Sequence, residues 1–135
     1  QAAAFGPTAA GVGQLGPALA RSTYALTRAA VALIRERIRR HGIECDAVEG
    51  GALLANWFDD DRILQRQQRL MAEHFGVHWQ SIDRSELQAH VRTRRYSAAL
   101  LEPDAFHFHP LKYAAGLAGA IAQAGARVHE DSPVV

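Results

Sequence analysis

The sequence predicts a mixed α/β fold of the α+β type, because helical and extended patterns alternate along its 135 residues. Between residues 18 and 40, apolar side chains recur every three or four positions, which is the period of an amphipathic helix. Residues 110–124 begin with a proline and are followed by a glycine, which is typical of the two ends of a helix. Short segments with strand character lie between these stretches, and no internal repeat is found.

The first half of the chain is expected to form one helix and one hairpin. The helix over residues 18–40 should end at Gly42, because glycine adopts the left-handed terminal conformation readily. Residues 45–48 and 52–57 have the character of two short strands, and the glycine pair between them favours a turn. The arginines of the helix are expected to form its solvated face.

Three helices and three strands are expected in the second half. A helix that starts at the acidic triplet 59–61 should end at Gly76, and a strand over 77–82 should follow. Asp83 and Glu86 have the spacing of a capping box, which predicts a short helix to about His90. The remaining expected elements are a strand at 96–102, a helix at 110–124 and a strand at 127–130. The side chains expected to pack the last helix on a sheet are Ala114, Leu117, Ala118 and Ile121.

Composition places the chain among soluble globular proteins, with 48% apolar and 21% charged residues. No apolar run reaches the roughly 18 residues that a membrane span needs. The N-terminal region has no charged start followed by an apolar block, so we expect a cytoplasmic location. Cys45 is the one cysteine, so it can form no internal disulfide, and we expect it to be a small buried apolar residue.

The basic residues do not predict a nucleic-acid surface. Fourteen of the fifteen are arginines, and they cluster at 35–40 and at 92–95. Neither cluster is interleaved with the aromatic side chains on which bases would stack, so nucleic acid is not an expected partner. Arg95 and Tyr96 begin an expected strand that could face a substrate, although cross-strand packing is the simpler role for Tyr96.

The histidines and serines do not predict a metal site or a hydrolase. His74 and His78 are separated by the helix-breaking Gly76, and no H-E-x-x-H pattern is present. His107 and His109 would share one side of a strand, but a closed site needs further ligands that the sequence does not name. His109 also directly precedes Pro110, which is typical of a helix start. No G-x-S-x-G elbow occurs, and the carboxylates of Glu102 and Asp104 are typical of a solvated loop.

A more specific signal lies in the C-terminal third. It contains His109, Pro110, Lys112 and Tyr113, then Gly-Leu-Ala at 116–118, Gly-Ala-Arg-Val-His-Glu at 125–130 and Ser-Pro-Val at 132–134. In order and spacing these motifs resemble the glycine/D-amino-acid oxidase superfamily of FAD-dependent oxidoreductases, particularly its gamma-glutamylputrescine oxidoreductase-like branch. The segment Arg-His-Gly-Ile-Glu-Cys-Asp at 40–46 is similar to the same family, so the resemblance covers nearly the whole chain.

The resemblance implies which residues contact FAD. In the family, a glycine-rich stretch lies against the pyrophosphate and the flavin, and Gly6, Thr8, Gly13 and Gln14 stand at matching or chemically similar positions. Ala10 and Gly11 replace the arginine and asparagine of that stretch. Val134 follows the family's turn, where the valine backbone contacts the adenine.

The resemblance also implies the organisation of the chain. Residues 1–18 correspond to the glycine-rich FAD approach, 19–108 to a connecting helix and part of an antiparallel-sheet substrate domain, and 109–135 to the return into a glutathione-reductase-like FAD domain. The family's strand–G-x-G-x-x-G–helix unit would precede residue 1. We therefore expect an internal segment that needs the remainder of the FAD domain and does not hold FAD tightly alone.

The implied activity is oxidation of a C–N bond of a small-molecule amine or amino acid to an imine, with no catalytic side chain named in this segment. Two other classes remain open at this point. A cofactor-less interaction module derived from the same fold would agree with Ala10 and Gly11. A small metal-binding protein would use His107 and His109.

Overall fold

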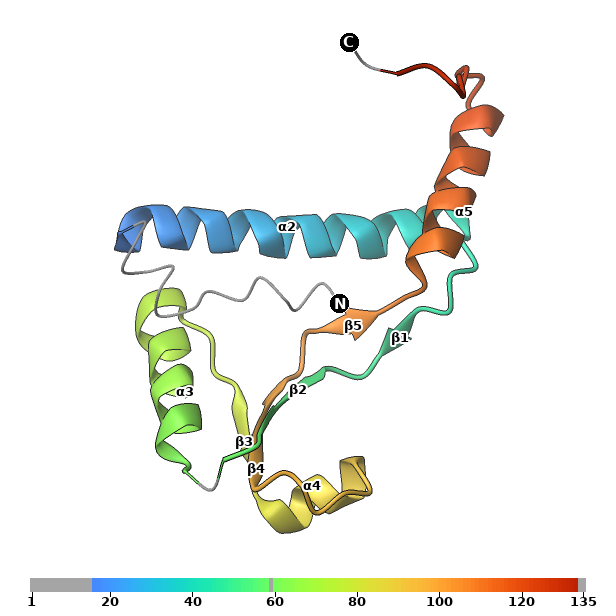
Figure 1. Cartoon of the computed structure of the whole chain (residues 1–135). Coiled ribbons are helices and arrows are strands. Elements are labelled where there is room, and N and C mark those ends of the chain that lie inside the picture. Colours follow the sequence, from blue (N-terminus) through green and yellow to red (C-terminus); the bar gives the residue numbers. More distant parts are fainter. Residues whose placement is uncertain (1–15, 59, 134–135) are drawn as a thin grey trace.

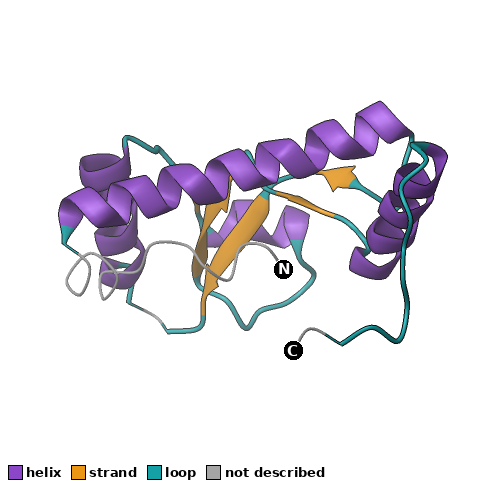
Figure 2. Cartoon of the chain, turned by 90° about the horizontal axis from the view of Figure 1, so that it is seen from above, coloured by secondary structure: helices purple, strands orange, loops and turns teal. Residues whose placement is uncertain are grey.

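The structure, a computed structural model, describes residues 16–58 and 60–133. A long helix lies along one side, antiparallel strands run beneath it, and a shorter helix stands at each end (Figure 1). Viewed from above, the long helix crosses over the strands (Figure 2). The elements in chain order are α2 (Pro17–His41), β1 (Val48–Glu49), β2 (Ala52–Asn56), α3 (Arg62–Phe75), β3 (Gln80–Ile82), α4 (Arg84–His90), β4 (Ala98–Glu102), β5 (Phe106–His107) and α5 (Pro110–Gln123). The predicted mixture of helices and strands is confirmed.

The described strands form two antiparallel sheets. The larger has the order β2-β4-β3, with Leu100 of β4 opposite Leu54 on one side and Ser81 on the other. The smaller pairs β1 with β5, where Val48 lies opposite His107. Because β4 is the central strand, both of its neighbours depend on its register.

The predicted hairpin between residues 45–48 and 52–57 is wrong. The first predicted strand shares only Val48 with β1 (Val48–Glu49), which pairs with β5, and the second contains β2, which pairs with β4. The two segments are successive parts of one extended arm of the chain. Gly51, with φ of 75°, lies in this arm and donates its backbone N–H to the carbonyl of Ala105. The glycine pair therefore bends a long ribbon and does not reverse the chain.

The capping signals at Gly42, Gly76 and Asp83 were predicted correctly, whereas α3 begins at Arg62, after the acidic triplet, and Asp61 makes no side-chain cap hydrogen bond. Gly42 and Gly76 end α2 and α3 in the left-handed conformation, with φ of 58° and 65°. Asp83 accepts hydrogen bonds from the backbone N–H groups of Ser85 and Glu86, and the Glu86 side chain accepts one from the Asp83 N–H. This reciprocal pair is the predicted capping box of α4.

The strand predicted at 127–130 is wrong, because these residues have no strand conformation. A strand is defined by ladder hydrogen bonds to a neighbour, and no described strand lies beside this segment. The expected packing of α5 on a sheet is also not observed among the described residues. Ala114 and Ala118 are exposed, and Ile121 is 39% exposed.

The core lies on both faces of the larger sheet. On one face, Leu100 packs with Leu64 and Met71 of α3 and with Trp79. On the other face, its neighbour Ala99 packs with Leu87 of α4 and with Ile82. Successive residues of a strand point to opposite faces, so β4 fills both clusters. Cys45, the expected buried cysteine, is 1% exposed.

Candidate functional site

The residues expected to contact FAD lie outside the part of the chain that the structure describes. They are Gly6, Thr8, Gly13, Gln14 and Val134. The structure does describe what adjoins them on each side. α2 begins two residues after Leu15, and the segment that follows α5 is described up to Pro133.

The start of α2 has the properties of an anion-accepting helix end. Gly16 precedes it with φ of 75°, Pro17 occupies its first turn, and no side-chain cap is formed there among the described residues. No acidic residue lies in the first turn. The N-terminus of a helix carries a partial positive charge. Because the first turn of α2 has no acidic residue, no carboxylate in that turn neutralises this charge. It would suit the diphosphate of a nucleotide cofactor.

A group of ionisable side chains joins α2 to the end of β4. Arg28 Nη2 lies 2.9 Å from Asp104 Oδ2 in the turn after β4. Burial raises the pKa of the half-buried Glu102, although the Arg28 guanidinium opposes that shift. Burial likewise raises the pKa of the Tyr24 hydroxyl. Glu102 is thus less solvated than a loop carboxylate would be, whereas Asp104 is exposed and fastens the turn to α2.

Arg35 connects α2 to β1 and to the turn after β4, and it is not part of a solvated patch. Its guanidinium donates to both carboxylate oxygens of Glu49 at 2.8 to 3.1 Å, and to the backbone carbonyl of Asp104. It also lies over the ring of Phe106, 4.4 Å from the ring centroid. The first arginine cluster was expected to be a solvated face, and Arg35 departs from that because β1 and β5 pass beneath it.

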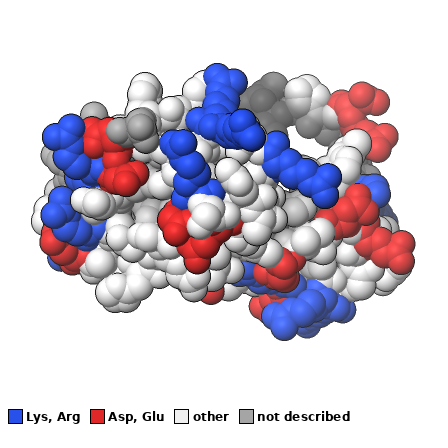
Figure 3. Space-filling view, turned by 90° about the horizontal axis from the view of Figure 1, so that it is seen from below, with Lys and Arg blue, Asp and Glu red and all other residues white. Residues whose placement is uncertain are grey.

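Arg95, the last residue of the second arginine cluster, packs against an aromatic side chain. The Arg95 guanidinium lies 3.6 Å from the centroid of the Trp57 ring, and the Tyr96 ring meets Trp57 edge-on at 6.1 Å. β4 begins at Ala98, so Arg95 and Tyr96 precede the strand. Tyr96 packs against the hydrophobic cluster formed by Ile82, Leu87 and Ala99. On the face of the molecule seen in Figure 3, basic side chains lie next to acidic ones.

The histidines considered as metal ligands occupy different places in the structure. His109 caps α5, as its position before Pro110 predicted, and its side chain accepts from the Lys112 N–H. His107 is exposed in β5. His74 is in the last turn of α3, before Gly76. No group of three or more His, Cys, Asp or Glu side chains among the described residues could hold a metal ion. Within the same residues, no helix is long and apolar enough to cross a membrane.

Comparison with known proteins identifies the family. The model of the DAO family, described as FAD dependent oxidoreductase, matches residues 1–135. The chain belongs to the DAO family of FAD-dependent oxidoreductases. The resemblance predicted from the C-terminal motifs is therefore confirmed, and FAD is the cofactor of this family.

Two curated relatives are similar to this DAO-family chain. Gamma-glutamylputrescine oxidoreductase of Escherichia coli (strain K12) is 35% identical over 102 residues, which cover 76% of the chain and 24% of the relative. Probable oxidoreductase OrdL of Haemophilus influenzae (strain ATCC 51907 / DSM 11121 / KW20 / Rd) is 32% identical over 124 residues, or 90% of the chain and 28% of the relative. The chain thus spans about a quarter of the length of these relatives. No solved structure matches it significantly.

Proposed function

We propose that the protein containing this chain oxidises a C–N bond of a small-molecule amine or amino acid. The observation that carries this proposal is the similarity to gamma-glutamylputrescine oxidoreductase, whose name specifies an amine-bearing substrate. In this reaction a carbon next to the amine loses a hydride and the nitrogen loses a proton, which leaves an imine. Water then converts the imine to a carbonyl compound and an amine or ammonia. Bound FAD supplies the two-electron acceptor for this chemistry.

The residues of this chain would bind and orient FAD, and none of them is assigned a proton-transfer role. Gly6, Thr8, Gly13 and Gln14 would approach the pyrophosphate and the flavin, with the uncapped start of α2 directly after them. Val134 would present its backbone to the adenine. The observed lack of a side-chain cap at Gly16 agrees with an anionic group there, because a built-in carboxylate would compete with it.

The three parts of the chain follow from this assignment. Residues 1–18 would form the FAD approach, and 19–108 would supply α2 and part of the substrate domain. Residues 109–135 would return to a glutathione-reductase-like FAD domain, where the remainder of that domain is the partner of α5. Leu111 and Ile121 of α5 are apolar and exposed, which supports the proposal that α5 packs against a further part of the protein. No observation favours the cofactor-less module or the metal-binding alternative.

The substrate class can be tested by anaerobic reduction of the bound flavin. The full-length protein is mixed with gamma-glutamylputrescine, with putrescine or with a 2-hydroxy acid, and the flavin absorbance near its visible maximum is followed. We expect an amine to bleach the flavin and the hydroxy acid to leave it oxidised, because the latter has no amine nitrogen to form an imine. Bleaching by the hydroxy acid and by neither amine would contradict the proposed substrate class.

A further inference from the structure

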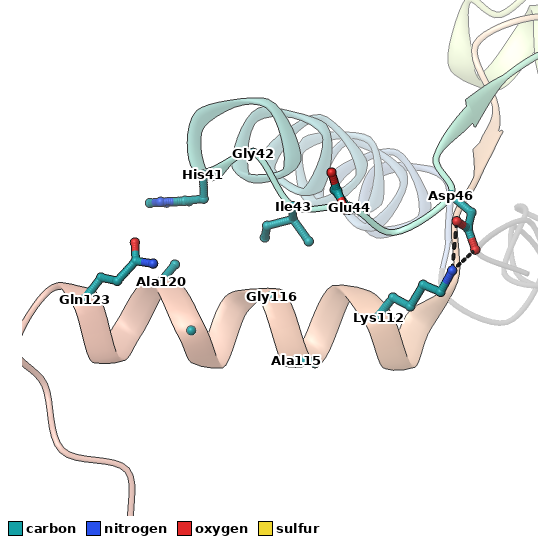
Figure 4. A pocket seen from close by; sticks show the side chains of 11 residues that line it. His41, Gly42, Ile43, Glu44, Asp46, Lys112, Ala115, Gly116, Ala120 and Gln123 are labelled. Carbon is teal, nitrogen blue, oxygen red and sulfur yellow. Dashed lines mark hydrogen bonds and ion pairs between the residues drawn. The ribbon is translucent and has the colours of Figure 1, made fainter.

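We draw no further inference here: the strongest candidate, the open cavity of about 640 Å³ between the end of α2 and α5, beside which Lys112 donates to Asp46 at 2.7 and 2.9 Å (Figure 4), carries nothing because nothing among the described residues shows what covers it.

Discussion

Replacement of Leu100 by alanine should lower the free energy of unfolding by about 2–5 kcal/mol, the range for a buried leucine truncated in a core. Leu100 is 1% exposed in the central strand β4 and packs with Met71 and Trp79. Its truncation would leave a cavity between the sheet and α3. Urea denaturation of the full-length protein measures the loss through the transition that includes this sheet.

Leu54 provides a matched control for Leu100. The two leucines are register partners on β2 and β4, but Leu54 is 47% exposed. Leu54→Ala should therefore cost less than about 1 kcal/mol, since much of its apolar surface already faces water. Equal losses for the two variants would mean that the buried face of β4 had been assigned incorrectly.

Gly51→Ala should destabilise the protein by about 3 kcal/mol, because it combines backbone strain with a steric clash. Gly51 has φ of 75°, and a Cβ atom there would lie 2.7 Å from the backbone carbonyl oxygen of Glu102. It would also lie 3.3 Å from Cα of Pro103. The two arms of the ribbon would have to separate where β2 and β4 begin to pair.

Gly42 separates these two contributions. It has φ of 58°, and nothing lies within 4 Å of a Cβ atom built there. Gly42→Ala should therefore show the backbone strain alone, about 1–2 kcal/mol. The measurement is again urea denaturation. If Gly51→Ala were no more destabilising than Gly42→Ala, the close approach of the ribbon arms would be disproved.

The parts of the fold that depend on nearby residues were predictable from the sequence. The ends of α2 and α3 follow from Gly42 and Gly76, because glycine favours the left-handed terminal conformation. The capping box of α4 follows from the spacing of Asp83 and Glu86. In each case the interacting groups are six or fewer residues apart, so the pattern specifies its own partner.

Strand pairing was not predictable in the same way. The glycine pair before Ala52 favours a hairpin locally, but β2 finds its partner in β4, about forty-five residues further along the chain. β5 has only two residues, too few to show a period. The segment 127–130 has the composition of a strand, yet composition cannot supply the neighbour that a ladder requires.

For the candidate site, the sequence indicated the family and its cofactor but not the contacts between distant segments. The His109 cap was predictable because Pro110 follows it. The pairing of Lys112 with Asp46 was not, since both residues are exposed and their charges alone name no partner. The FAD contacts expected at Gly6, Thr8, Gly13, Gln14 and Val134 remain predictions, because these positions lie outside the described residues.

The central claim is that the full-length protein is an FAD enzyme, and the most direct measurement is titration of its apoprotein with FAD. Flavin is removed, FAD is added back, and binding is followed by flavin fluorescence, with the protein concentration known independently. We expect saturation at one FAD per chain, with riboflavin binding more weakly because it lacks the diphosphate that the start of α2 would attract. An apoprotein of native fold that shows no saturable FAD binding would contradict the account.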